Sequence, residues 1–227
     1  MKYGFGIWKP YQYVDEKGEP RGFHIRLVRR LAADIGCQVD FVQLQFAQTL
    51  EGIESGDIQW SGLTTPTAKR GLIAKFSIPY ASDFYALYVL SKRLPAFRKK
   101  SLTELLASGF RLGVTKGHYY GPEFQKIAEE LELSDNIIVA FDTYDNHDKL
   151  ISGEIDGFLD NPLIVAYAQR GKTGTRIASL PSIQFKNPIA FILSKKSFPE
   201  HLVMPLNDAI RKLLADPEFS EKWNLRQ

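Results

Sequence analysis

The stretch Ser55-Gly56-Asp57-Ile58-Gln59-Trp60 returns 97 residues later as Ser152-Gly153-Glu154-Ile155-Asp156-Gly157. In both copies a helical pattern ends at a glycine, which suits a helix C-cap because glycine adopts positive φ without strain, and a strand then begins. The flanking sequence also corresponds, since each half of the chain has strand, loop, helix, strand, helix and strand in that order. The repeat therefore predicts two similarly built lobes of an α/β fold.

Hydrophobic spacing predicts the individual elements. An amphipathic helix that ends at Gly36 is indicated by apolar residues three or four apart, namely Ile25, Val28, Leu31, Ala32 and Ile35. A polar connector at 94–100 precedes Ser101-Leu102-Thr103-Glu104, a capping box that opens the next helix. The other predicted strands are 3–8, 37–42, 58–60, 85–90, 110–114, 137–141, 155–159 and 188–194, and the other predicted helices are 49–54, 123–131, 144–152, 162–169 and 201–215.

Composition excludes several classes of protein. Of 227 residues, 44% are hydrophobic and 24% are charged, which is ordinary globular composition rather than disordered sequence. The 29 basic residues are nearly balanced by 26 acidic ones, so we expect no nucleic-acid partner. Cys37 is the only cysteine, which excludes an intramolecular disulfide, and no apolar stretch approaches the roughly 20 residues of a membrane helix.

Signatures of catalysis and of cofactor or metal binding are absent from the sequence. There is no Gly-x-Ser-x-Gly elbow, no His-Glu-x-x-His, no Walker loop and no complete dinucleotide fingerprint, and the histidines lack ligand spacing. The stretch 171–176 falls short of P-loop spacing and is interpreted as a plain turn. N-capping and solvation explain Asp142, Asp145 and Asp148 better than a calcium loop does. We therefore expect no enzyme activity, no cofactor and no metal.

Residues suited to ligand binding follow the predicted strands, where open α/β sheets place their ligands. Trp8 and Tyr11 follow the first strand, and the loop 64–70 offers three threonine hydroxyls, backbone amides and the guanidinium of Arg70. Such a loop suits a carboxylate, since arginine binds it bidentately while hydroxyls and amides take the remaining lone pairs. In the alternative interpretation Thr67 caps a helix and Arg70 is a surface charge.

Several motifs occur together in an order that resembles one protein family. They are Gly22-Phe23 with Leu27, Ser55-Gly56-Asp57-Ile58, Thr65-x-Thr67-x-x-Arg70, Phe76-Ser77-Ile78-Pro79-Tyr80, Gly113-Val114-x-x-Gly117 and Gly153-Glu154-Ile155-Asp156 with Asp160. Over nearly the whole chain this order resembles the family 3 bacterial extracellular solute-binding proteins, which are polar amino-acid-binding proteins of the periplasmic-binding-protein type II fold. The block from Thr65 to Tyr80 is the most specific part of the resemblance.

The resemblance implies an α/β, two-lobe, periplasmic-binding-protein-like clamp with two hinge crossings, near 88–92 and 185–191. Lobe 1 would comprise 1–90 and 188–227, and lobe 2 would comprise 91–187. Arg70, with the amide and hydroxyl of Thr65, would hold a ligand α-carboxylate. Asp160 would hold an α-ammonium from lobe 2. The side-chain pocket would be lined by three aromatic residues, Trp8, Tyr11 and Phe46, for which core packing is the alternative, above all for Phe46.

Two departures from the family pattern stand out. After Gly117 the family usually has a small hydroxyl residue that contacts the carboxylate, whereas this chain has His118-Tyr119-Tyr120. Either the ligand differs from a simple α-amino acid, or the amides at the following helix N-terminus suffice; His118 and Tyr119 therefore join the candidate ligand contacts. His24 and Arg26 replace acidic residues common in the first helix, and we expect this change to affect the surface rather than the pocket.

Three functions are compatible with the resemblance. The leading hypothesis is non-catalytic binding of an amino acid or related carboxylate between the lobes, for delivery to the membrane permease of an ABC importer. Such a protein would be a periplasmic or otherwise extracytoplasmic monomer, with any signal or anchor outside this sequence. The alternatives are a ligand-sensing input domain of a membrane signalling protein and a dehydratase on the same fold. A dehydratase would need an acid over its substrate, and only Asp160 or His118 are candidates.

Overall fold

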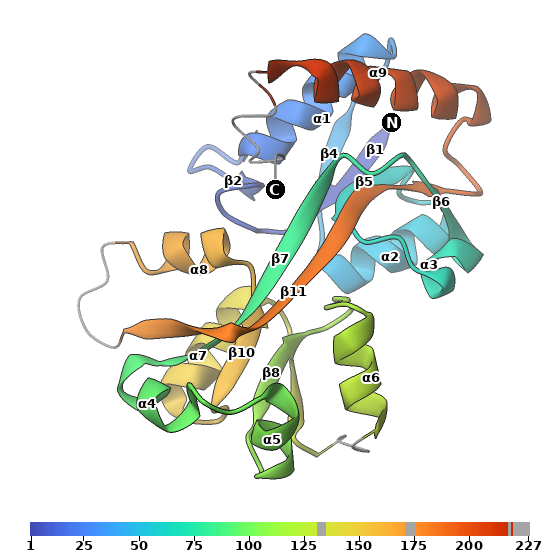
Figure 1. Ribbon diagram of the computed structural model, residues 1–227. Coiled ribbons are helices and arrows are strands. Elements are labelled where there is room, and N and C mark those ends of the chain that lie inside the picture. Colours follow the sequence, from blue (N-terminus) through green and yellow to red (C-terminus); the bar gives the residue numbers. More distant parts are fainter. Residues whose placement is uncertain (131–134, 171–175, 218, 220–227) are drawn as a thin grey trace. The chain divides into compact units, whose positions relative to one another are not determined.

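The computed structural model describes residues 1–130, 135–170, 176–217 and 219 (Figure 1). The chain forms two units: unit 1 is Met1–Asp83 with Pro188–Gln227, and unit 2 is Phe84–Asn187. It passes from unit 1 to unit 2 within strand β7 (Ala81–Leu90) and returns within strand β11 (Ile177–Ser194). The α/β class is confirmed, and the first crossing lies a few residues before the predicted stretch 88–92. The division into two lobes, with boundaries between residues 90 and 91 and between residues 187 and 188, remains a prediction.

Unit 1 is a sheet covered on both faces. Its strands run in the order β4 (Asp40–Gln43), β1 (Lys2–Phe5), β5 (Trp60–Thr64) and β11, and β6 (Ala74–Phe76) pairs with β11. Strand β1 is parallel to β4 and β5, whereas β11 is antiparallel to β5. A small hairpin is formed by β2 (Tyr13–Val14) and β3 (Pro20–Arg21).

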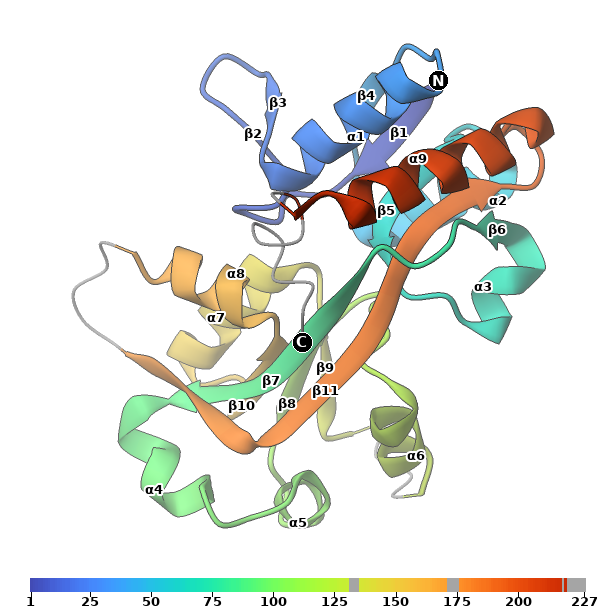
Figure 2. The same cartoon turned by 45° about the horizontal axis from the view of Figure 1, so that its top comes forward.

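Helices bury both faces of the unit 1 sheet. Helices α1 (Phe23–Asp34) and α9 (Val203–Ala215) lie side by side in Figures 1 and 2, and their apolar residues join one core with β1, β5 and β11. Helix α2 (Phe46–Ser55) packs Ile53 into a second core with Ile58, Ala74 and Ile192. The remaining unit 1 helices are the short α3 (Ala68–Ile73) and the 3-10 turn Glu200–Leu202.

Unit 2 has the strand order β7, β10 (Gly157–Asp160), β8 (Leu112–Thr115) and β9 (Ile137–Ala140). Strand β10 is antiparallel to β7 and parallel to β8, which is parallel to β9. One core contains residues of α5 (Leu102–Ala107) and α6 (Pro122–Glu130), and another contains residues of α7 (Thr143–Ser152) and α8 (Pro162–Ala168). The predicted capping box at Ser101 and Glu104 is confirmed, with both of its hydrogen bonds present.

The sequence repeat is a structural repeat. Gly56 ends α2 and Gly153 ends α7, both in the left-handed conformation with φ of 93° and 80°. Gln59 and Asp156, at the same place in the two copies, accept the backbone N–H at the start of the neighbouring strand, at 2.7 and 2.9 Å. The prediction of two similarly built halves is therefore confirmed at the level of individual hydrogen bonds.

The repeat extends to a pair of glycines that the six-residue match did not include. Gly4 of β1 and Gly113 of β8 each lie against a helix and the residue that precedes the next strand. A Cβ on Gly4 would come within 2.9 Å of Thr49 and 3.1 Å of Ile58, and one on Gly113 would come within 2.3 Å of Asn146 and 2.6 Å of Ile155. These neighbours are again 97 residues apart in sequence. Only glycine lets the helix approach the strand this closely in either unit.

Several predicted elements were wrong in extent, among them the strand predicted at 58–60, which is β5 and shares only Trp60 with that range. The first strand ends at Phe5 instead of residue 8, because Trp8 turns back through hydrogen bonds with Gln12. The connector 94–100 contains a helical turn, α4 (Leu94–Phe97), after the 3-10 turn Ser91–Arg93, since Phe97 is buried against Phe110. The last strand begins at Ile177, eleven residues before the predicted start, and the predicted turn at 171–176 lies mostly outside the described residues.

Within the described part of the chain no helix is both long and apolar enough to cross a membrane. The same residues hold no cluster of three or more side chains that could bind a metal ion. Asp142 is the N-cap of α7, where its carboxylate accepts the N–H groups of Tyr144 and Asp145, as the capping interpretation predicted.

Candidate ligand-binding residues

Five of the predicted site residues lie in unit 1 and follow the carboxyl ends of parallel strands. Trp8 and Tyr11 come after β1, Phe46 begins α2 after β4, and Thr65 comes directly after β5, with Arg70 in the short helix α3 that follows. Since the three strands are parallel and adjacent, their carboxyl ends meet at one edge of the sheet. The topology therefore brings these residues to a single edge of unit 1.

Arg70 is buried, with only 8% of its surface exposed. Its Nη1 donates a hydrogen bond of 2.7 Å to the carbonyl oxygen of Thr65, and its guanidinium lies over the Phe46 ring at 5.3 Å from the ring centre. The Thr67 hydroxyl accepts the N–H of Arg70 at 3.2 Å and caps α3. One half of the alternative interpretation is thus correct, because Thr67 is a cap. The other half is wrong, because Arg70 is not a surface charge.

The contact with Arg70 bears on the role of Phe46. A ring beneath a guanidinium holds that cation in place by its quadrupole while leaving the edge of the guanidinium, with its N–H donors, directed sideways. Thr65 is also buried, at 6% exposure, and its carbonyl fixes one of those donors. Phe46, Thr65 and Arg70 therefore form one preorganised group that can bind an anion. The role of Phe46 in this group is to hold the Arg70 guanidinium, in addition to any part it has in core packing.

Trp8 and Tyr11 lie together in a tight turn. Their ring centres are 5.6 Å apart, and Tyr11 N donates to Trp8 O at 2.8 Å. Trp8 is 9% exposed, whereas Tyr11 is half-buried. Such a pair offers an apolar wall with polar edges.

Gln12, in the same turn, is a candidate that sequence reasoning missed. It is 7% exposed, and among the described residues its buried Oε1 has no hydrogen-bond donor. A buried amide oxygen of this kind is costly unless a donor reaches it, so Gln12 can accept a hydrogen bond from a ligand. Its position between two tyrosines was the only sequence signal.

Asp160 lies in unit 2, at the carboxyl end of β10, with 2% exposure. Its Oδ1 accepts the N–H of Asn161 at 2.7 Å. Burial, and secondly the charge of Asp160, raise the pKa of the Tyr88 hydroxyl to about 12. The N-cap of α8 is Asn161, whose side chain accepts the N–H of Leu163, so Asp160 does not cap this helix. A buried carboxylate is suited to a cationic partner.

His118 and Tyr119 follow β8 in unit 2. Gly117, with φ of 81°, turns the chain after the strand, and His118 N donates to Thr115 O at 3.1 Å. The half-buried His118 ring lies 6.3 Å from Tyr85 and 6.0 Å from Tyr120, measured between ring centres. Tyr120 is buried, and its hydroxyl accepts the N–H of Thr115, so it braces the turn. Tyr119, beside it in sequence, is half-buried.

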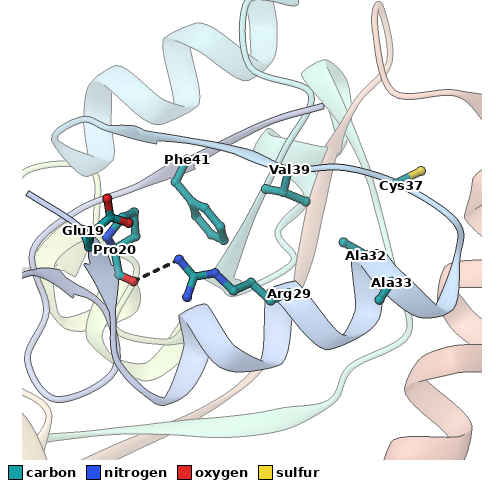
Figure 3. Close-up of a pocket in the computed structure, with 8 residues that line it drawn as sticks. All are labelled: Glu19, Pro20, Arg29, Ala32, Ala33, Cys37, Val39 and Phe41. Carbon is teal, nitrogen blue, oxygen red and sulfur yellow. Dashed lines mark hydrogen bonds between the residues drawn. The ribbon is translucent and has the colours of Figure 1, made fainter.

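A separate hollow of about 390 Å³ lies on unit 1 between α1, β4 and the β2–β3 hairpin (Figure 3). Arg29 reaches across it, donating to the carbonyl of Pro20 at 3.3 Å, and its guanidinium lies over the Phe41 ring at 5.3 Å. The residues that line it include none of the eight predicted site residues. We therefore do not associate this hollow with the candidate site.

One expectation about the first helix was wrong. His24 is fully buried, not at the surface, with ring nitrogens hydrogen-bonded to the hydroxyls of Tyr3 and Tyr80. Burial lowers the pKa of its imidazole to about 3, so the ring is neutral at ordinary pH. Arg26 is exposed, as expected.

Each unit has a mixed sheet with helices on both faces, and polar or aromatic residues follow the ends of the parallel strands. This arrangement is typical of α/β proteins that bind a ligand. Residues 3–225 match the family model described as bacterial extracellular solute-binding proteins, family 3. The chain belongs to this family, and the resemblance read from its motifs is confirmed.

The chain is also similar to an amino-acid-binding protein and to two solved structures. The amino-acid-binding protein AabA of Dichelobacter nodosus is 25% identical over 223 residues, covering 94% of this chain and 83% of the relative. An ancestral arginine-binding protein, solved with arginine bound, has a TM-score of 0.79 at 24% identity, covering 98% of this chain and 96% of the other. A histidine kinase sensor domain similar to periplasmic binding proteins has a TM-score of 0.80 at 17% identity, covering 98% and 95%. The two structural similarities establish the fold alone.

Proposed function

We propose that the protein binds an amino acid or a related small carboxylate without transforming it and delivers it, outside the cytoplasm, to the membrane permease of an ABC importer. Membership of the solute-binding family supports a small-molecule ligand. The name of the Dichelobacter nodosus relative favours an amino acid. Importer delivery and location follow from the usual role of such proteins.

One observation carries the choice of a carboxylate: the buried Arg70, seated on Phe46 and tied to the Thr65 carbonyl. A guanidinium costs free energy to bury, and an anionic ligand that bonds two of its N–H groups offsets that cost. The rigid setting lowers the entropy lost on binding, because the guanidinium is already placed. Arg70 is therefore our proposed anchor for the ligand's carboxylate, with Thr65 beside it.

Asp160 favours an amino acid over a plain carboxylate. It is a buried carboxylate that accepts the Asn161 N–H, and a buried negative charge suits an ammonium group. In this proposal Asp160 holds the α-ammonium, and Trp8, Tyr11 and Gln12 contact the ligand side chain. His118 and Tyr119 complete the set from the turn after β8.

The proposal is tested by a thermal-shift panel of the twenty standard L-amino acids and their desamino analogues, with native mass spectrometry of the purified protein for co-purified ligand. At a concentration 100 times Kd a ligand should add about 2.7 kcal/mol to the free energy of unfolding. An amino acid should stabilise the protein more than its desamino analogue and be recovered chemically unchanged. If none of the forty compounds raises the melting temperature, the amino-acid proposal fails.

A sensory role is the second candidate, favoured by the likeness of the fold to a histidine kinase sensor domain. Ligand binding would be the same, and the difference lies in what is attached to the chain. The gene that encodes the full-length protein decides it: a membrane helix followed by a signalling module in the same reading frame would replace the importer proposal.

A further inference from the structure

A chain of buried polar side chains runs through unit 1 from β1 to β5. Tyr3 and His24 are fully buried, Tyr80 is 2% exposed, and none of the three lies at the candidate site. His24 Nδ1 is 3.0 Å from the Tyr3 hydroxyl, and its Nε2 is 2.6 Å from the Tyr80 hydroxyl. The Tyr80 ring is stacked on Phe191 at 4.6 Å, which fixes its place.

Each hydrogen bond in this series of side chains donates in the same direction, from Leu63 through Tyr80 and His24 toward Tyr3. Leu63 N donates to the Tyr80 hydroxyl at 2.8 Å, so the single Tyr80 hydrogen must go elsewhere, and His24 Nε2 is the partner within reach. Nε2 is then an acceptor, and the imidazole proton lies on Nδ1, which donates to Tyr3. The neutral imidazole is consistent with its complete burial.

This series of hydrogen bonds ends at Leu63, whose backbone is strained. Leu63 has φ of 53°, and it is the only described residue other than glycine with positive φ. Such a conformation is uncommon for a branched side chain and persists where the surroundings enforce it. It coincides with a register shift in the pairing of β5 with β11. Gly62 lies against His24, because a Cβ there would be 2.3 Å from His24 Cε1.

Leu63 immediately precedes the loop 64–70, which holds Thr65 and Arg70. We propose that Tyr80, with His24 holding its hydroxyl hydrogen, is a positioning residue that keeps Leu63 in its left-handed conformation and so sets this loop for a carboxylate. This inference rests on the proposed function. Tyr80 acts on this loop through the backbone of Leu63.

Tyr80→Phe tests the inference, with Tyr3→Phe as the matched control. Both remove one buried hydroxyl from His24. Tyr80 accepts the Leu63 N–H, whereas Tyr3 is hydrogen-bonded to the Ser61 side chain and to the backbone of Gly62 on the same strand. In the ligand-free protein, we expect Tyr80→Phe to speed hydrogen exchange of the Leu63 and Thr65 amides at least tenfold relative to Tyr3→Phe. The probe for binding is the L-amino acid that most stabilises the parent in the thermal-shift panel, and its Kd should rise at least tenfold in Tyr80→Phe and less than threefold in Tyr3→Phe.

A second substitution separates positioning from general destabilisation. Glycine adopts the left-handed conformation without help, so Leu63→Gly in the Tyr80→Phe background should recover much of the lost affinity, although the double variant is no more stable. Equal effects of Tyr80→Phe and Tyr3→Phe on exchange and affinity, or no recovery by Leu63→Gly, would overturn the proposal.

Measurements on the unmodified protein complete the test. The ¹⁵N shifts of the His24 ring should show Nδ1 protonated and Nε2 unprotonated, and an Nε2-protonated ring would overturn the inference even if Tyr80→Phe did not fold. If no amino acid binds the parent, the binding measurements refute the proposed function. The exchange and ¹⁵N arms still decide whether Tyr80 and His24 hold the Leu63 turn.

Discussion

Replacing Arg70 with alanine should lower both the stability of the protein and its affinity for the ligand. In the folded protein the substitution leaves the buried Thr65 carbonyl without its 2.7 Å donor, at a cost of about 1–3 kcal/mol, and removes the cation over Phe46, worth about 0.5–2 kcal/mol. The free energy of unfolding should therefore fall by at least about 1 kcal/mol. From the sequence alone, with Arg70 seen only as a ligand contact, no such loss was expected.

The effect on binding is measured separately from the effect on folding. Binding the ligand's carboxylate without the Arg70 guanidinium costs about 2–5 kcal/mol, which raises Kd about 30-fold to 5,000-fold. Arg70→Lys keeps the charge but not the planar fork, so its Kd should lie between those of the parent and Arg70→Ala. Lys69→Ala, at the exposed neighbour in the same helix, should change neither quantity.

Titration calorimetry with the most stabilising amino acid, at a temperature where each variant is folded, measures these constants, and guanidinium melts give the stabilities. An Arg70→Ala variant that binds within threefold of the parent, about 0.7 kcal/mol, would remove Arg70 from the site and with it the carboxylate argument.

Three further predictions concern other parts of the two units. Asp160→Asn keeps an oxygen for the Asn161 N–H and leaves the Asn161 cap untouched, so the melting temperature should be near-native. Amino-acid binding should weaken at least tenfold, about 1.4 kcal/mol. Normal binding in calorimetry would refute the ammonium assignment and make His118 and Tyr119 the next residues to test. The pKa of His24 is lowered to about 3 in the folded state, so the unfolded chain takes up a proton below pH ~6.5 that the folded chain excludes, and stability is present above that pH and lost as pH falls toward 3. The difference in unfolding free energy between the parent and His24→Asn should therefore shrink by on the order of 2 kcal/mol from pH 7.5 to pH 5.0 in denaturant melts, and a difference independent of pH would contradict the assigned burial. Gln12→Leu removes a buried acceptor and should leave the melting temperature unchanged or raised while Kd rises more than threefold; a lowered melting temperature with unchanged Kd would make Gln12 a structural residue.

The α/β class and the element order could be predicted because they depend on local patterns. The glycine C-caps at Gly56 and Gly153 and the capping box at Ser101 are short-range signals, and the structure contains all three. The burial of His24 also had a signal: it lies three, four and seven residues before Leu27, Val28 and Leu31, on the apolar face of α1. The family resemblance, which suggested a surface position, outweighed that periodicity.

Other features had a weak local signal or none. In the first part of β11, Ile183 and Phe185 alternate with Gln184 and Lys186 as in a half-buried strand, but Pro181 and Pro188 interrupt the pattern, and the full length of the strand depends on pairing with distant segments. Leucine disfavours positive φ, so nothing in the sequence marks Leu63 as left-handed; the Tyr80 hydroxyl, seventeen residues away, makes that conformation possible. Thr65 and Arg70 could be named from the loop motif, but the contact of Arg70 with Phe46 brings together α3 and α2, which no local pattern marks.

Because the chain leaves unit 1 at Asp83 and re-enters it at Pro188, unit 2 is a continuous insertion and unit 1 is made of two pieces. The first 83 residues hold β1, α1 and β5, but the core they share needs Phe191 of β11 and Leu206 and Ile210 of α9. On a ribosome moving at roughly 5–20 residues per second, these arrive roughly 6–25 seconds later, whereas unit 2 emerges without interruption. Unit 2 can thus fold before unit 1, although it is encoded after unit 1 begins. Early termination anywhere before α9 would leave the unit 1 core exposed, and such fragments are natural substrates for chaperones and proteases.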